Sequence, residues 1–232
     1  MQVTTIGQKE KLRTLRDNQY FHGLSEDSLK QLADHMTLRK YERGEALFWE
    51  GDPCSGLHIV EKGSIKLFRV SPQGRQYIVR MMQEGDTCNE VPAFDGGTNP
   101  VNVEALEDTT AWVVEAEAVL DLMRKDPFFM ELIVENLTKM MRHLVHLVSE
   151  LAFYQVTHRL ARLISELPDD ELNGETNVRV TQDQLAARLG TVREVVARSL
   201  KELERSGAIR VENRRIHIQD ADVLQQWTQP WN

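Results

Sequence analysis

Apolar residues between Met130 and Tyr154 recur at alternating steps of three and four residues. The row consists of Met130, Ile133, Leu137, Met140, Leu144, Leu147, Leu151 and Tyr154. This is the heptad spacing of a coiled-coil seam, and the segment contains no Pro or Gly that would interrupt a helix. The pattern predicts one long helix that begins after Pro127, and we expect this row to form a homodimer interface.

A second apolar row lies on another face of the same predicted helix and comprises Val134, Met141, Val145, Val148 and Ala152. One row can meet a partner chain while the other covers the chain's own domain. On the heptads alone, a core helix of a larger bundle explains the pattern equally well.

Short apolar runs between turn residues precede the long helix. They span residues 57–60, 65–70, 76–81, 101–106 and 110–114. Regular spacing of this kind predicts a sandwich or barrel of short antiparallel strands. Upstream, residues 1–23 predict no well-defined element. Ser25 can cap a helix that runs to about Met36, with an apolar side formed by Leu24, Leu29, Leu32 and Ala33.

A third pattern follows the long helix. Residues 157–167 predict a helix, and residues 178–180 a short strand. Two segments, Thr181 to Gln184 and Thr191 to Glu194, have the form of capping boxes, with Gly190 as a turn between their helices. Residues 209–211 and 216–218 predict a basic hairpin. Two capped helices, a tight turn and a hairpin are typical of a winged helix-turn-helix.

These patterns predict an α+β chain in three parts. Residues 1–126 form an N-terminal antiparallel β-roll that acts as a sensor. Residues 127–154 form the dimerisation helix and hinge, and residues 155–232 form a winged helix-turn-helix that binds DNA.

Composition agrees with this organisation. The 232 residues are 41% hydrophobic and 28% charged, as in ordinary globular proteins. No apolar run approaches the length of a membrane span and no secretory signal is evident, so we expect a cytoplasmic protein with no membrane partner. Two cysteines, Cys54 and Cys88, make neither a disulfide framework nor a zinc motif.

The net charge of −8 argues against nucleic acid only if it is taken as a whole. Between Arg188 and Arg215, eight Lys or Arg residues stand against four Glu residues, a local charge of +4. A local basic patch matters more for a phosphate backbone than the global sum.

The second helix of the predicted helix-turn-helix has two distinct sides. Val192, Val196, Leu200 and Leu203 should pack inward, whereas the outer side carries Arg193, Glu194, Ala197, Arg198 and Lys201. Its first two turns enter the major groove in this type of docking. Arg matches guanine O6 and N7, Glu accepts from cytosine N4, and a small Ala lets the helix approach closely. Phosphate contacts suit Lys201, Arg205, Arg214 and Arg215. An ordinary amphipathic helix with solvated charges is the alternative, and the surrounding motifs favour DNA binding.

Three motifs resemble those of the CRP/FNR family of bacterial transcription regulators. Residues 51–65 read Gly-Asp-x-x-x-x-Leu-x-x-Val-x-x-Gly-x-Ile and look like the family's β-roll signature. Residues 151–159 look like its hinge, and Arg193-Glu194-x-x-Ala197-Arg198 resembles the recognition helix of the CRP branch.

The resemblance implies a homodimer that reads a palindrome, with half-sites like TGTGA and TCACA, and contacts RNA polymerase. It also implies that Arg193, Glu194 and Arg198 contact bases and that Thr157, Thr181 and Lys201 lie near phosphates. We include Thr191 in the DNA-binding set because it precedes the recognition helix.

The chain departs from the family's cyclic-AMP-binding members. These hold the nucleotide with Gly-Glu, Arg-Ser and Thr-Ser pairs, which here fall on Asn89-Glu90, Pro100-Val101 and Leu144-Val145. A cyclic phosphate needs a cation or N–H donors, and Pro100 offers neither. We therefore expect no cyclic AMP binding of the usual kind. The expected effector pocket comprises Cys88, Asn89, Glu90, Val101, Leu144 and Val145.

Other sensor chemistries stay open. Residues 1–50 contain no Cys, which excludes the iron–sulfur branch. Cys88 sits where haem-binding carbon monoxide sensors place a thiolate, but their nearby His falls on Glu90. Oxidation of Cys88 or Cys54, another small ligand, or an effector-free regulator that is always competent for DNA are the alternatives, and we expect no cofactor.

Two other functions are disfavoured. A cupin-like enzyme would need clustered His residues, and the roll contains only His58. A ligand-binding module without DNA activity would not need the winged helix.

Overall fold

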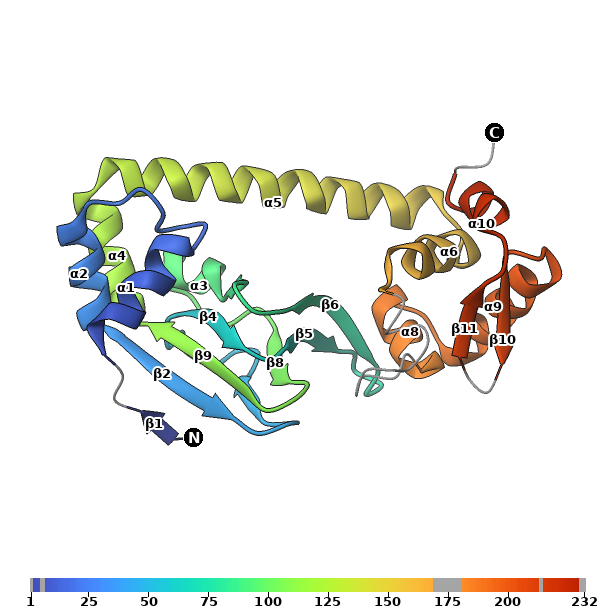
Figure 1. The fold of residues 1–232 in the computed structure, drawn as a ribbon, viewed down its shortest axis with the longest axis horizontal. Coiled ribbons are helices and arrows are strands. Elements are labelled where there is room, and N and C mark those ends of the chain that lie inside the picture. The colour runs from blue at the N-terminus through green and yellow to red at the C-terminus, as the bar shows by residue number, and fades with distance from the viewer. Residues whose placement is uncertain (1, 5–6, 169–180, 213–214, 230–232) are drawn as a thin grey trace. The chain divides into compact units, whose positions relative to one another are not determined.

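A computed structural model describes residues 2–4, 7–168, 181–212 and 215–229 (Figure 1). The chain divides into two compact units. The N-terminal unit contains residues 1–69 and 79–141, and the C-terminal unit contains residues 70–78 and 142–232. The division falls inside the long helix, so this helix is shared by both units.

Two antiparallel sheets build the roll of the N-terminal unit. The five-stranded sheet has the order β1-β2-β9-β4-β7, and the four-stranded sheet has the order β3-β8-β5-β6. The strands are β1 (Gln2–Thr4), β2 (Met36–Tyr41), β3 (Ala46–Phe48), β4 (Leu57–Lys62), β5 (Ile65–Val70), β6 (Gln76–Met82), β7 (Thr87–Cys88), β8 (Asn102–Ala105) and β9 (Thr109–Val114). The predicted antiparallel β-roll is confirmed. The sequence patterns missed β1, β2, β3 and β7, of which β1, β3 and β7 are too short to show a period.

Strand β4 shows how the sheet separates two cores. Leu57 and Ile59 point to a cluster shared with the helices, whereas Val60 belongs to a second cluster inside the roll. Alternation of this kind follows from the two-residue period of a strand. All four residues from Leu57 to Val60 are buried, and each large apolar side chain contributes about 1.5–3 kcal/mol by leaving water.

Four helices accompany the sheets: α1 (Gln8–Asp17), α2 (Glu26–Asp34), α3 (Glu90–Asp95) and α4 (Ala116–Lys125). Figure 1 shows α1, α2 and α4 gathered at one end of the roll. The predicted cap of α2 is confirmed, because the Ser28 N–H donates to Ser25 Oγ at 3.1 Å. The predicted apolar side of α2 is buried as well.

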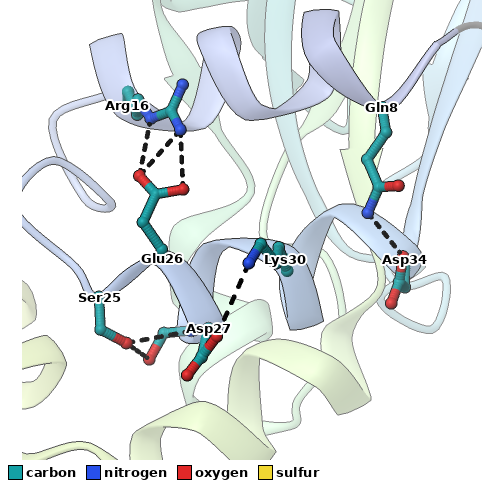
Figure 2. A network of polar contacts seen from close by, with 8 residues as sticks. Gln8, Arg16, Ser25, Glu26, Asp27, Lys30 and Asp34 are labelled. Atoms are coloured by element: carbon teal, nitrogen blue, oxygen red, sulfur yellow. Dashed lines mark hydrogen bonds and ion pairs between the residues drawn. The ribbon is translucent and has the colours of Figure 1, made fainter.

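Polar contacts tie α1 to α2 at the surface, as Figure 2 shows. Arg16 of α1 donates to both carboxylate oxygens of Glu26, and Gln8 donates to Asp34. The Arg16 and Glu26 side chains are 49% and 58% exposed, so their ion pair adds at most about 1 kcal/mol. The joint between α1 and α2 therefore depends on the residues beneath them.

Those residues overturn the expectation that residues 1–23 form no defined element. Leu15, Tyr20 and Phe21 are at most 1% exposed and lie in the core shared with the helices, where the Phe21 ring stacks on Phe129 at 5.6 Å. Their partners are distant in sequence, so a local pattern does not reveal this burial.

The long helix α5 runs from Pro127 to Phe153 and confirms the predicted helix. Pro127 is its first residue, where a missing N–H is harmless. Asp126 Oδ1 accepts from the N–H groups of Phe128 and Phe129 at 3.0 and 3.2 Å, which caps the first turn.

The described part of the C-terminal unit contains the helices α6 (Val156–Glu166), α8 (Gln182–Leu189), α9 (Arg193–Arg205) and α10 (Ala221–Trp227), and the hairpin β10 (Ile209–Glu212) and β11 (Arg215–Ile218). The hairpin pairs Ile209 with Ile218 and Glu212 with Arg215. The core of the C-terminal unit contains Leu160, Ile164, Leu185, Val196, Leu203, Ile216 and Leu224. The winged helix-turn-helix is confirmed, α10 was not predicted, and the strand predicted at 178–180 lies outside the described residues.

One predicted capping box is confirmed and the other is wrong. The Gln184 N–H donates to Thr181 Oγ1 at 3.2 Å, and the Thr181 N–H donates to Gln184 Oε1 at 2.8 Å. At α9, however, the N-cap is Val192, which offers no side-chain cap. Thr191 instead donates its N–H to the Ala186 carbonyl and completes the end of α8.

Candidate DNA-reading surface and effector region

The turn between α8 and α9 depends on Gly190. Its φ of 64° lies in the left-handed region, where a side chain would be strained. The Gly190 N–H donates to the Ala186 carbonyl, so α8 ends there and the chain turns into α9. This turn fixes the first residues of α9 against α8.

The two predicted sides of α9 are confirmed by burial except at Val192, which is the half-buried N-cap. Val196, Leu200 and Leu203 are at most 4% exposed and pack in the core of the unit. Arg193, Glu194, Arg198 and Lys201 are exposed, and Ala197 between them is half-buried. The exposed side presents three cations and one carboxylate from a single helix.

Arg193 makes two long polar contacts with the first turn of α8. Its Nη1 lies 3.5 Å from Asp183 Oδ2, and its Nε donates to Gln182 Oε1 at 3.4 Å. The side chains of Arg193 and Asp183 are 62% and 70% exposed. The sequence patterns assigned Asp183 no role, although an acidic residue in the first turn of a predicted helix is a recognisable signal.

Thr157 was expected near a phosphate, and the structure shows its hydroxyl engaged within the domain. Thr157 is 6% exposed, and its hydroxyl donates to Glu202 Oε2 at 2.7 Å and lies 2.9 Å from Ser199 Oγ. Ser199 and Glu202 belong to α9, so this hydroxyl joins α6 to α9 inside the domain.

The other predicted phosphate contacts differ in how they are placed. Thr181 is exposed, but its hydroxyl serves as the cap of α8. Arg205 and Arg215 are exposed at the end of α9 and the start of β11, Thr191 is half-buried, and Arg214 lies outside the described residues.

The residues expected around an effector are mostly buried. Cys88 is fully buried, Asn89 and Glu90 are each 6% exposed, and Val101 packs against the core inside the roll. Asn89 has a φ of 73° and stands at the N-terminus of α3. Its position brings Cys88 of β7 and Glu90 of α3 next to one tight bend.

The Gly56 carbonyl accepts hydrogen bonds from two side chains at this bend. Asn89 Nδ2 donates to it at 3.1 Å, and His58 Nδ1 lies at the same distance. Burial lowers the pKa of His58 to about 4, so the ring is neutral at pH 7 and donates from Nδ1. Among the described residues, His58 Nε2 and Asn89 Oδ1 have no hydrogen-bond partner. These are two buried acceptors close to the predicted pocket.

Glu90 has an internal partner that sequence reasoning missed. Burial raises the pKa of Glu90 to about 7, and the Tyr20 hydroxyl donates to Glu90 Oε1 at 3.4 Å. Burial and the nearby Glu90 carboxylate also raise the pKa of Tyr20 above its ordinary value. Tyr20 comes from the segment after α1, for which no sequence signal indicated a contact with Glu90.

The same segment makes two further polar contacts. Asn18 Nδ2 donates to Thr87 Oγ1 at 2.7 Å, and Asn136 Nδ2 of α5 donates to the Gln19 carbonyl at 3.1 Å. Asn18, Thr87 and Asn136 are all buried. Residues 18–20 therefore connect β7 and α3 with the first half of α5.

The residues expected as the apolar wall of the pocket are exposed. Leu144 and Val145 are 51% and 63% exposed, and their place at an effector stays a prediction. Pro100 is exposed and supplies no N–H, and Val101 supplies no hydroxyl. The positions that carry Arg and Ser in cyclic-AMP-binding members therefore offer a cyclic phosphate neither a cation nor a side-chain donor.

The predicted dimer row is divided by the structure. Ile133 is 2% exposed, and Met130 and Leu137 pack against the same core of the N-terminal unit. Ile133 therefore cannot meet a partner, and for this residue the prediction is wrong. Met140, Leu147 and Tyr154 are half-buried, Leu144 is exposed, and the Leu151 side chain lies outside the described residues.

The second apolar row of α5 is the exposed one. Val134, Met141, Val145 and Val148 are 57–65% exposed. The heptad spacing does not distinguish two apolar faces of one helix, and only the packing of α5 on its own unit shows which face is covered.

Both cysteines of this region favour the thiol form. Burial raises the pKa of Cys54 and of Cys88, so neither is a ready thiolate. Among the described residues, no group of three or more His, Cys, Asp or Glu side chains could hold a metal ion.

No helix in the described ranges is long and apolar enough to cross a membrane.

The fold and the exposed face of α9 are those of a helix-turn-helix DNA-binding regulator, and comparison with known proteins agrees. Residues 38–126 match the cyclic nucleotide-binding domain, and residues 158–227 match the Crp-like helix-turn-helix domain. The chain belongs to the CRP/FNR family of transcription regulators.

The relatives extend over nearly the whole chain. The cyclic AMP receptor protein of Thermus thermophilus is 26% identical over 212 residues, which cover 91% of this chain and 97% of the relative. A solved CRP/FNR-family regulator from the same organism has a TM-score of 0.67 at 23% identity, covering 82% of this chain and 97% of that chain. The c-di-GMP-responsive global regulator of Xanthomonas campestris has a TM-score of 0.69 at 21% identity, covering 85% and 100%.

Proposed function

We propose that this protein is a homodimer that reads a palindromic, TGTGA-like site through the major groove. The carrying observation is the exposed side of α9, where Arg193, Glu194 and Arg198 occupy the first two turns beside a fixed Gly190 turn. Arg and Glu at these places match guanine and cytosine edges. Lys201, Arg205 and Arg215 supply phosphate contacts. Contact with RNA polymerase belongs to the same proposal and rests on family membership.

The exposed apolar row on α5 supports the homodimer. Met141, Val145 and Val148 are each more than 60% exposed in the single chain, and such a row normally becomes buried against a partner. A palindrome also needs two reading helices about one helical turn apart, which one chain does not provide.

The effector part of the proposal is a regulator that does not answer to cyclic AMP in the usual way. Pro100 and Val101 supply neither a cation nor a side-chain donor for a phosphate, and Glu90 is already engaged by Tyr20. Proteins similar to this chain differ in effector, since a solved structure is described as c-di-GMP-responsive and a sequence relative as a cyclic AMP receptor. The alternatives are another small ligand near Glu90 or a form that is always competent for DNA.

A haem or thiol sensor is the second candidate. It rests on the position of Cys88 opposite His58 in the pairing of β4 and β7. Full burial and the raised pKa of Cys88 argue against a free thiolate, so this candidate ranks below the first.

A binding assay tests the DNA part. Fluorescence anisotropy with a labelled TGTGA/TCACA duplex and a scrambled duplex, at one fixed salt concentration, should show tighter binding to the palindrome without any added nucleotide. Equal affinity for the two duplexes contradicts the proposed site.

The effector part is tested on the same protein. Cyclic AMP should change neither the affinity for the palindrome nor the heat of mixing in calorimetry, and micromolar binding contradicts the proposal. An ultraviolet–visible spectrum and a native mass of fresh protein decide the second candidate, because a Soret band establishes haem and a small mass excess reveals another ligand.

A further inference from the structure

Two side chains of α8 contact the residue that should read a guanine. Asp183 Oδ2 lies 3.5 Å from Arg193 Nη1, and Gln182 Oε1 accepts from Arg193 Nε at 3.4 Å. Gln182 and Asp183 are the first two residues of α8, directly after its N-cap Thr181. Two acceptors from neighbouring residues of α8 therefore lie beside two different nitrogens of the Arg193 guanidinium, Nη1 and Nε.

An acidic residue in the first turn of a helix also has a simpler explanation. A carboxylate there interacts favourably with the helix dipole. The chain contains a direct comparison for this effect, because Asp222 occupies the same second position of α10, after its own N-cap Asp220. Asp183 differs from Asp222 in lying against an arginine of the recognition helix.

The pairing affects how Arg193 meets DNA. A phosphate attracts Arg193 mainly through charge, and the Asp183 carboxylate cancels part of that charge and repels phosphate itself. A guanine edge offers two acceptors in fixed positions that match the guanidinium fork. Asp183 therefore weakens the contact that carries no sequence information more than the contact that carries it.

We infer that Asp183, assisted by Gln182, positions Arg193 and raises the sequence specificity of the protein by suppressing its non-specific contacts with phosphate. This inference rests on the proposed function of Arg193. Asp183 itself touches no base in this scheme, and its whole effect passes through the arginine.

The test compares Asp183→Asn with the wild-type chain on a pool of duplexes with a randomised central segment. Sequencing of the bound fraction defines the preferred site, and anisotropy then gives its affinity relative to a scrambled duplex. Asp183→Asn should lower this ratio about 3- to 10-fold, mainly by tighter binding to the scrambled duplex. The salt dependence on that duplex should steepen by about 0.9 for each phosphate gained.

Asp222→Asn is the matched control. It removes the same charge from the same helix position, so it should leave the ratio unchanged. If Asp222→Asn lowers the ratio as much as Asp183→Asn, net charge or the helix dipole explains the effect and the inference is overturned.

A double variant tests whether the effect passes through Arg193. In an Arg193→Ala background, adding Asp183→Asn should change the ratio by less than about 2-fold. A full effect in that background overturns the positioning role. A wild-type chain that enriches no sequence overturns the proposed function itself, whereas wild-type enrichment with an unchanged Asp183→Asn ratio overturns only the role of Asp183.

Discussion

The polar side chains at the bend between β7 and α3 are buried, whereas those on the outer face of α9 are exposed. At the bend, Asn89 and Glu90 are 6% exposed, and their side chains bond to Gly56 and Tyr20 of the same chain. On α9, Arg193 and Arg198 are exposed, and within the described residues Arg193 makes two long contacts with α8. The polar groups of the first region are buried against the chain itself, whereas those of the second are exposed to solvent.

The two regions differ in whether the environment of their side chains follows from one local segment or from distant parts of the sequence. The exposed face follows from the helical period of one segment, and its side chains are exposed as that period predicts. The buried bend depends on a segment after α1 that is far away in sequence. A residue such as Glu90 therefore cannot be assigned to a ligand from its motif alone, since another part of the chain already binds it.

The largest expected effect concerns the exposed row of α5. Met141→Glu should place a charge in the proposed dimer interface and weaken the dimer by about 3–5 kcal/mol, because a buried charge without a partner is costly. Native mass spectrometry at micromolar concentration should show a monomer. Lys139→Gln, which removes only an exposed ion pair with Glu135, should stay dimeric. A dimeric Met141→Glu variant would show that this row is not the interface.

The next effect tests the closed bend through its pH dependence. The folded pKa of Glu90, about 7, lies above its ordinary value of 4.5, so the folded protein keeps a proton that the unfolded chain loses between these pH values. The free energy of unfolding should therefore fall by about 2 kcal/mol between pH 5 and pH 7 through this group, and level off above pH 7.

Urea unfolding at several pH values measures this dependence. Glu90→Gln should flatten it, because the amide resembles the protonated acid. Glu131→Gln, at an exposed position of α5, should leave it unchanged. An unaltered pH profile in Glu90→Gln would mean that the carboxyl is not buried as described.

A smaller effect is expected at the reading face. Arg193→Ala should cost about 1–3 kcal/mol of discrimination at the guanine that this residue reads. Anisotropy with palindromic and scrambled duplexes measures the ratio. Arg205→Ala, at the exposed end of the same helix, should weaken binding to both duplexes and keep their ratio. A wild-type ratio in Arg193→Ala would remove this residue from base recognition.

The smallest effect isolates one hydrogen bond of the bend. Tyr20→Phe leaves the buried Glu90 carboxyl without its donor and should lower the free energy of unfolding by about 1–2 kcal/mol. The loss should be larger at pH 8 than at pH 6, since the charged carboxylate needs the donor more. Tyr77→Phe, at a residue that is 38% exposed, should change stability by less than about 0.5 kcal/mol.

The sequence predicted the architecture because its main elements carry strong local signals. The heptad spacing predicts α5, the Thr181 capping box and Gly190 predict the turn into α9, and turn residues separate the longer strands. Short strands such as β7 carry too few residues for a period to appear, and α10 went unrecognised.

The site was predictable only in part, for a physical reason. The two sides of α9 follow from one helix, so their burial was predicted well. The burial of Thr157 depends on Ser199 and Glu202 across the domain, and the burial of Ile133 depends on which apolar face of α5 docks on the roll. Both are properties of the folded arrangement, and neither has a local sequence signal.

Residues 18–20 connect three elements that the chain order keeps apart. Tyr20 binds Glu90 of α3, Asn18 binds Thr87 of β7, and the Gln19 carbonyl accepts from Asn136 of α5. Glu90 and the long helix are therefore linked through two hydrogen bonds and one short peptide segment. The three attachment points fall on three consecutive residues, so α3, β7 and the first half of α5 are all fastened to the same short stretch of chain.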